Sequence, residues 1–199
     1  MTWERVASPK RFKRLVWNEE IEEQAVAMAM DKMAGVSGDR RTNQFGYAET
    51  EKAMQRHLMG PRGELMFKST YKLPDSVFHD TGDYDFMLGK VRTEIKTATV
   101  HQYPQMHWDC LVSSCWDDRP HKQRCQAYVF QKVFMPKDRS TVHDAWAVGW
   151  IGSEEFWSRA QKLSKGTKRQ YGEIKDANAY MIPISALYDM KYIKGWLMQ

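Results

Sequence analysis

GDYDFMLGKVRTEIKTATV, residues 82–100, has the pattern of two short strands joined by a tight turn. Gly89 and Lys90 separate two short runs that are rich in apolar and β-branched residues, which is typical of paired strands. A glycine at the first central position suits a two-residue type II′ turn. The hairpin closed by this turn places Leu88 opposite Val91. The same register predicts Asp85 opposite Glu94 and Asp83 opposite Lys96.

This register divides the hairpin into two faces, because side chains alternate along a strand. The first face is almost wholly apolar and consists of Tyr84, Phe86, Leu88, Val91, Thr93 and Ile95. The second holds nearly all of the charge and consists of Asp83, Asp85, Met87, Arg92, Glu94 and Lys96. Both strands give the same division, which supports the register.

The charged face carries a repulsion that needs an explanation. Facing residues have Cβ atoms about 5 Å apart, and like charges directly opposite each other destabilise a sheet, so Asp85 and Glu94 should repel. A divalent cation held by both carboxylates would remove the repulsion, and oxygen ligands favour Mg²⁺ or Mn²⁺. Lys96 points at the same place and could offset charge that develops on phosphorus. The alternative is an ordinary solvated hairpin face.

These residues resemble the motif of the PD-(D/E)xK nuclease superfamily, which has the restriction-endonuclease-like fold, and small phage and prophage-type members in particular. The resemblance lies in Asp85, the hairpin and Glu94-Ile95-Lys96, with a helical acid supplied by Glu64 in GPRGELMF. It extends in scattered motifs over residues 58–190, including GWIGSEEFWSRA and AYMIPISAL.

The resemblance implies a role for each of these residues. Asp85 and Glu94 correspond to the metal ligands and Lys96 to the catalytic lysine, while Glu64 corresponds to the acid that supports the metal or its water. The pattern departs from the family in two respects, the first of which is that no proline directly precedes Asp85. The proline–aspartate pair is Pro74-Asp75, in an expected loop, and Asp83 competes with Asp85 for the ligand role.

The order of the expected elements predicts an α/β fold, with a central mixed sheet flanked by helices as in a restriction-endonuclease-like core. We expect an irregular arm over residues 1–17, helices over residues 18–35, 48–58, 60–73 and 153–163, strands over residues 126–134 and 144–152, and a short strand followed by a helical turn over residues 179–190. Residues 1–57 would then be a basic arm and helical extension. Residues 58–199 would be the nuclease-like core, and the whole chain one compact unit.

The charge of the chain indicates a polyanionic partner. The net charge is +5, and basic residues cluster within residues 9–14, 39–41 and 161–170. Nucleic acid is the partner that such a balance favours first, and the resemblance to the nucleases implies DNA. The candidate phosphate contacts are Lys162, Lys165, Lys168 and Arg169, with Lys10, Arg11, Lys13 and Arg14 as a second group. A solvated charge run is the alternative for both groups.

The cysteines leave a zinc site open. The chain has three of them, an odd number that argues against a disulfide framework. Cys110, Cys115, Cys125 and His121 could bind zinc, although their spacing lacks the usual C-x₂-C pairs. Buried, reduced cysteines in strands are the other interpretation.

Location and assembly follow from weaker signals. No apolar run reaches the roughly 20 residues of a membrane helix, and the N-terminus lacks the apolar stretch of a secretory signal. We therefore expect a soluble protein of the cytoplasm, the host cytoplasm if the chain is viral. A nuclease that cuts both strands often works as a dimer, so a homodimer is one candidate assembly.

Together these signals predict a Mg²⁺-dependent deoxyribonuclease, an endonuclease rather than an exonuclease. Two other classes stay open. A non-catalytic nucleic-acid-binding protein could use the same fold with an idle acidic site, and a viral assembly protein could carry the charged face merely solvated.

Overall fold

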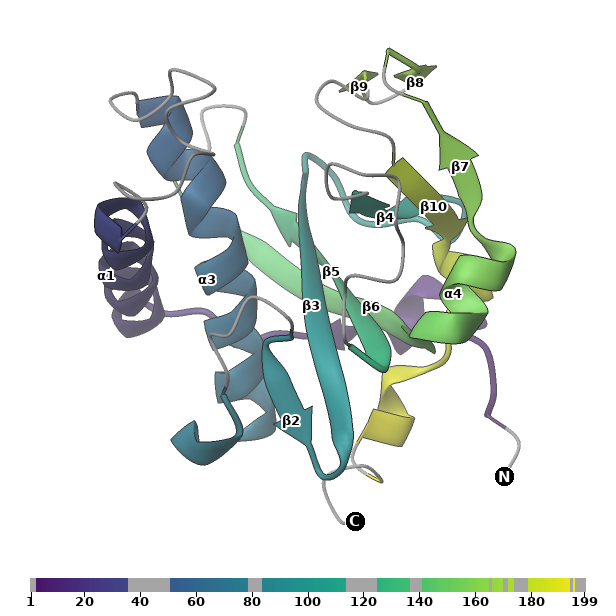
Figure 1. Ribbon diagram of the computed structural model, residues 1–199, viewed down its shortest axis with the longest axis horizontal. Coiled ribbons are helices and arrows are strands. Elements are labelled where there is room, and N and C mark those ends of the chain that lie inside the picture. Colours follow the sequence, from purple (N-terminus) through teal and green to yellow (C-terminus); the bar gives the residue numbers. More distant parts are fainter. Residues whose placement is uncertain are drawn as a thin grey trace.

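The computed structural model describes residues 3–35, 51–78, 84–113, 125–136, 141–164, 166–169, 172–173, 179–193 and 195. They form an α/β fold around a five-stranded sheet of order β1-β6-β5-β3-β2 (Figure 1). The sheet is mixed, because β3 and β5 are parallel while the other neighbours are antiparallel. The predicted α/β class and mixed sheet are therefore confirmed. Among the described helices, none is both long and apolar enough to cross a membrane.

The elements have the following bounds. The main sheet consists of β1 (Lys13–Arg14), β2 (Phe86–Leu88), β3 (Val91–Val100), β5 (Ala127–Phe134) and β6 (Asp144–Gly152). A second sheet of order β4-β10-β7 consists of β4 (Asp109–Ser113), β10 (Ala179–Pro183) and β7 (Gln161–Leu163), and β8 (Lys168–Arg169) pairs with β9 (Gly172–Glu173). The α-helices of the described residues are α1 (Glu19–Gly35), α3 (Glu51–Tyr71) and α4 (Ser153–Arg159). Short 3₁₀ turns are η1 (Pro9–Arg11), η3 (Asp75–Val77), η5 (Ile184–Ala186) and η6 (Met190–Tyr192).

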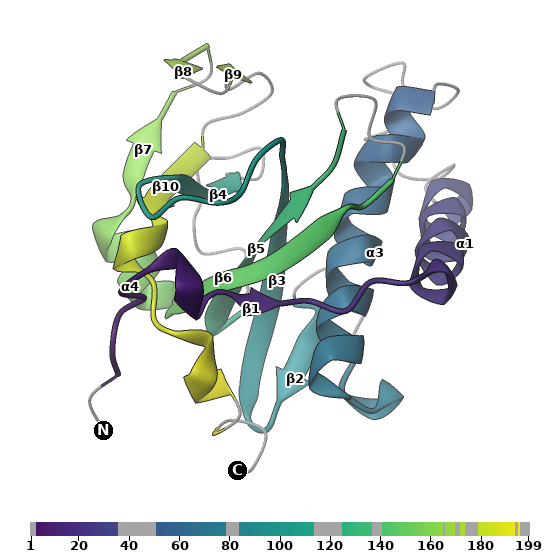
Figure 2. The same ribbon diagram turned by 180° about the vertical axis from the view of Figure 1, so that it is seen from behind.

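The two sides of the main sheet are covered differently. Figures 1 and 2 show α1 and α3 on one side, and α4 with the β4-β10-β7 sheet on the other. Each side has its own apolar core: Phe67 of α3 packs with Phe86 and Ile95 in the first, and Phe156 of α4 packs with Tyr128 in the second. Strand β3 therefore lies between two hydrophobic layers.

The hairpin forms with the predicted turn and register. Leu88 pairs with Val91, and Phe86 pairs with Thr93. Gly89 has φ +60°, as the first central residue of a type II′ turn requires. The predicted apolar face is correct from Phe86 onwards. It is wrong at Tyr84, which packs against the core on the α4 side, because the chain leaves the regular ladder at Asp85.

One continuous helix replaces the two that the sequence predicts around Gly60-Pro61. Helix α3 runs from Glu51 to Tyr71 with Pro61 in its interior, so a helix start at Pro61 is wrong. Proline removes one helical hydrogen bond. The buried side chains of Leu58 and Phe67 on either side of Pro61 hold both halves against the sheet. The part of the helix predicted at residues 48–50 lies outside the described residues, and the expected boundary between residues 57 and 58 falls inside α3.

Helix α3 approaches the sheet very closely at Gly63. A Cβ atom on Gly63 would lie 1.9 Å from Oγ1 of Thr97 and 3.0 Å from Oε1 of Gln131. Only a residue without a side chain fits there. This contact fixes α3 against β3 and β5, and it places the next residue, Glu64, near the edge of β3.

Helix α1 follows its prediction, and α4 is shorter than expected. The side chain of Asn18 accepts a hydrogen bond from the backbone N–H of Ile21 at 2.9 Å, which caps the start of α1. Helix α4 ends at Arg159 rather than at residue 163, because the next residues form β7 and pair with β10. Its N-cap residue is Gly152, which has no side chain to cap the helix, and Ser153 is its first residue.

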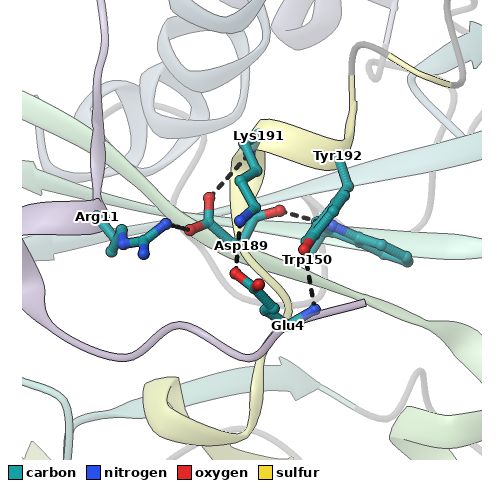
Figure 3. A network of polar contacts seen from close by, with 6 residues as sticks. All are labelled: Glu4, Arg11, Trp150, Asp189, Lys191 and Tyr192. Carbon is teal, nitrogen blue, oxygen red and sulfur yellow. Dashed lines mark hydrogen bonds and ion pairs between the residues drawn. The ribbon is translucent and has the colours of Figure 1, made fainter. Parts of the chain in front are cut away.

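The N-terminal arm is more ordered than the expectation of an irregular arm. Lys13 and Arg14 form β1 on the free edge of β6. Figure 3 shows how the arm is tied to the C-terminal segment: Arg11 pairs with Asp189 at 3.2 Å, and Glu4 pairs with Lys191 at 2.5 Å. The indole N–H of Trp150 donates to the backbone oxygen of Asp189 at 3.1 Å. Arg11 therefore serves the fold, and the arm is part of the same body as the sheet.

Candidate active site

Asp85 stands at the point where β2 begins, and it is bonded to β3 twice. Its backbone N–H donates to the oxygen of Thr93 at 3.0 Å. Its carboxylate oxygen Oδ2 accepts a hydrogen bond from the backbone N–H of Ile95 at 2.6 Å. The two bonds bracket Glu94, so the predicted regular cross-strand pair of Asp85 and Glu94 is wrong in detail. The carboxylate takes the place that a strand carbonyl would have, as aspartate side chains often do.

Glu94 and Lys96 lie together on the face of β3 opposite to Ile95. Nζ of Lys96 is 2.6 Å from Oε1 of Glu94, and the side chains are 24 % and 15 % exposed. Ile95 packs in the core beneath α3, so the alternation of the strand directs its two neighbours to the α4 side. The sequence prediction that Glu94 and Lys96 point at one place is confirmed.

Glu64 approaches Asp85 from the other side of the sheet. It lies in the middle of α3 and is only 7 % exposed. The sequence places it in the first turn of a helix, where the positive helix end would stabilise any glutamate. That explanation is wrong, because α3 begins more than two turns earlier. A carboxylate that is buried in the middle of a helix needs a hydrogen-bonding or cationic partner.

The negative charges of Glu94 and Glu64 act on Asp85 from opposite sides of the sheet. Burial raises the pKa of Asp85 well above its usual value, and the negative charges of Glu94 and Glu64 raise that pKa further. The Ile95 N–H and the charge of Lys96 lower it, but by less. A cation bound next to Asp85 would offset the repulsion that Glu94 and Glu64 exert on its carboxylate.

The donor set suits a hard divalent cation. Carboxylate oxygens are the ligands that Mg²⁺ and Mn²⁺ prefer. Asp85 and Glu94 could hold such an ion, and Glu64, which comes from the α3 side, could hold a water bound to it. Within the part of the chain that the structure describes, no three His, Cys, Asp or Glu side chains are grouped tightly enough to form a ready-made metal site. Ligands supplied by water, backbone or substrate would complete the coordination, as is usual for Mg²⁺.

The other predicted residues are placed as follows. Lys162 is exposed on β7, and Lys168 and Arg169 form β8. Lys165 and Asp83 lie outside the described residues, as do Cys115 and His121 of the possible zinc site. Cys110 and Cys125 are buried, and burial raises the pKa of each thiol to about 11.

The sequence did not indicate what lies beside Glu94. Strand β5 pairs in parallel with β3 and sets Tyr128 next to Glu94. Burial raises the pKa of Tyr128, with a smaller contribution from neighbouring Cys125. Parallel strands are joined by long connections, so no turn in the sequence reveals their register. The aromatic run of residues 126–134 was the one available signal.

Searches against protein-family models, curated proteins and solved structures find no match to this chain. The resemblance to PD-(D/E)xK nucleases therefore rests on the sequence motif of Asp85, Glu94 and Lys96 alone.

Proposed function

We propose that this chain is a Mg²⁺-dependent deoxyribonuclease of the PD-(D/E)xK type. The observation that carries the proposal is the hydrogen bond from the Ile95 N–H to the Asp85 carboxylate, because it holds Asp85 at the backbone of the residue that separates Glu94 from Lys96. The restriction-endonuclease-like fold is part of the proposal. Its support is a mixed sheet with the β2–β3 hairpin at one edge, a parallel β5 beside it, and α3 carrying an acid toward the hairpin.

Each residue has a distinct task in this proposal. Asp85 and Glu94 would hold the cation, and Glu64 would hold the cation or a water bound to it. The ion, when bound, lowers the pKa of a water and polarises the phosphodiester. Lys96 is held by Glu94 at 2.6 Å, and its ammonium group orients the attacking water and offsets negative charge on the phosphoryl oxygens.

Positive charge supports DNA as the substrate. The chain has 30 Lys and Arg against 25 Asp and Glu, and Lys162 is exposed on β7. Basic side chains neutralise phosphates and release their counterions, which makes such binding depend on salt. We place this activity in the cytoplasm, in that of the host if the chain is viral.

The test uses circular single-stranded DNA and supercoiled duplex DNA, with Mg²⁺ or EDTA. An endonuclease linearises a circular molecule, whereas an exonuclease leaves it intact. Cleavage should require the metal and should be lost in Asp85→Asn and Lys96→Met.

Asp75→Asn is the matched control for the aspartate. Asp75 is the aspartate that directly follows a proline, but it is exposed in η3 and paired with Lys68. Cleavage that survives in Asp85→Asn, or that is lost equally in Asp75→Asn, would reject the site. Salt-dependent DNA binding without cleavage of any form would instead favour the non-catalytic alternative.

A further inference from the structure

A row of aromatic side chains leads away from the candidate site on the α4 side of the main sheet. It begins at Glu94, which is the parallel ladder partner of Tyr128. The ring of Tyr128 lies 6.3 Å from that of Trp157 in α4, centroid to centroid. Trp157 in turn lies 4.8 Å from Tyr180 of β10, at an interplanar angle of 78°. The row therefore crosses from the main sheet through α4 to the second sheet.

The far end of the row is a basic residue. Tyr180 pairs with Lys162 in the antiparallel ladder of β10 and β7, and residues that pair directly share one face of a sheet. Lys162 is exposed, and β8 with Lys168 and Arg169 follows shortly along the chain. The row thus has a carboxylate with a lysine at one end and a lysine at the other.

Burial changes along the row in a way that suits a ligand. Tyr128 is fully buried and forms the base, next to the buried ring of Phe156. Trp157 and Tyr180 are only partly buried, so each ring keeps part of its surface for another contact. An aromatic ring packed on a core and partly open to solvent is a platform on which a nucleic-acid base can stack.

We propose that Trp157 and Tyr180 stack on unpaired bases and that the substrate of the site is single-stranded DNA. This inference rests on the proposed function, since it takes Glu94 and Lys96 as the place where the phosphodiester lies. Bases of a duplex are stacked inside the helix and do not offer their faces to such a platform. Lys162 would contact a phosphate of the same strand, beyond the stacked base.

The experiment measures binding without cleavage. Fluorescence anisotropy is recorded in EDTA with a labelled thymidine oligonucleotide and with a duplex of the same length, using the wild-type chain. We expect the single strand to bind at least tenfold more tightly than the duplex. Trp157→Ala should weaken single-strand binding about tenfold, since one stacked base is lost.

Trp3→Ala is the matched control. Trp3 is a tryptophan 40 % exposed that packs on Trp150 and Tyr188, away from the row, so its loss should leave the affinity unchanged. Because Trp157 also contacts the core ring of Phe156, Tyr180→Ala is measured as well, and thermal unfolding verifies that each variant is folded. Tyr180→Ala should weaken single-strand binding without affecting the duplex.

The outcomes separate this inference from the proposed nuclease activity. Equal or tighter binding of the duplex, no binding of either DNA, or unchanged affinity in folded Trp157→Ala and Tyr180→Ala would overturn the aromatic platform. None of these results depends on cleavage. If instead the single strand binds through Trp157 while Mg²⁺ produces no cleavage of any DNA, the platform stands and the nuclease proposal fails.

Discussion

The carboxylate of Asp85 accepts a 2.6 Å hydrogen bond from the backbone N–H of Ile95, the residue between Glu94 and Lys96. This bond holds an acid at the edge of β3 where two other carboxylates already act on it. Negative charges close together destabilise a sheet. Groups with strongly shifted pKa values often mark functional sites.

Replacing Asp85 should stabilise the chain in the absence of metal. Its folded pKa is raised above the unfolded value. Stability from Asp85 is thus present at low pH, where the group is protonated, and is lost as pH rises through the folded pKa. Asp85→Asn keeps an acceptor for the Ile95 N–H and removes the charge. In EDTA its Tm should exceed the wild-type Tm at pH 8, and the difference should shrink on acidification. A lower Tm at pH 8 would show that the charge itself is structural.

Adding Mg²⁺ or Mn²⁺ should reverse that order. A cation that binds only the folded chain stabilises it by mass action, and here it would also cancel the repulsion among Asp85, Glu94 and Glu64. We expect thermal unfolding to show a rise in the wild-type Tm with millimolar Mn²⁺ and no rise for Asp85→Asn. An equal rise in both proteins would mean that the ion binds elsewhere.

Lys96 should affect catalysis more than metal binding. It pairs with Glu94 at 2.6 Å, so Lys96→Met leaves the carboxylates more negative and should not weaken Mn²⁺ binding measured by calorimetry. Loss of its ammonium group should lower kcat about 100-fold, the typical effect of removing one group that stabilises transition-state charge. The control is Lys90→Gln, in the exposed turn of the same hairpin. Weaker Mn²⁺ binding with unchanged kcat would contradict the assigned role.

Two glycines of α3 should respond in opposite ways to alanine. Gly63→Ala places a Cβ 1.9 Å from Oγ1 of Thr97 and should cost about 1–3 kcal/mol in the free energy of unfolding. Gly60→Ala meets only Oε1 of Glu64 at 3.5 Å, so it should gain up to about 1 kcal/mol from helix propensity. Urea unfolding measures both. A stable Gly63→Ala variant would mean that α3 does not lie against β3 as described.

The pair of Arg62 and Glu22 should be essential to the attachment of α1. Arg62 is 1 % exposed and lies 2.5 Å from Glu22, so Glu22→Ala leaves a buried charge without that partner and should cost about 3 kcal/mol. Glu23→Ala, at the exposed neighbouring position, should change stability by less than about 0.5 kcal/mol. Urea unfolding of both variants gives the comparison, and equal effects would contradict the assignment.

Local chemistry made part of this fold predictable. The turn at Gly89-Lys90 and the alternation around it were enough for the hairpin register, and the aromatic run at residues 144–152 was enough for β6. Long-range effects were not predictable. Helix α3 continues through Pro61 because of packing against the sheet, which local helix propensity does not reveal. The parallel pairing that places Tyr128 beside Glu94 joins strands without a tight turn, so no local sequence signal predicts it.

The candidate site shows the same division. The residues Asp85, Glu94 and Lys96 could be chosen from their spacing, because strand alternation places them together. The hydrogen bond of Asp85 to the Ile95 N–H could not be predicted from the sequence. It forms because the regular pairing of the hairpin ends at Phe86 and Thr93, so that Asp85 is not part of the ladder. The burial of Glu64 could not be predicted either, because the sequence predicts a helix that begins at residue 60, whereas α3 begins at Glu51.

Anomalous diffraction from crystals grown with Mn²⁺ would locate the bound ion itself. We expect one strong peak bonded to carboxylate oxygens of both Asp85 and Glu94, and no peak there in crystals of Asp85→Asn. Fully formed wild-type crystals that show no anomalous peak at these two side chains, at a Mn²⁺ concentration that supports DNA cleavage, would contradict the proposed metal site.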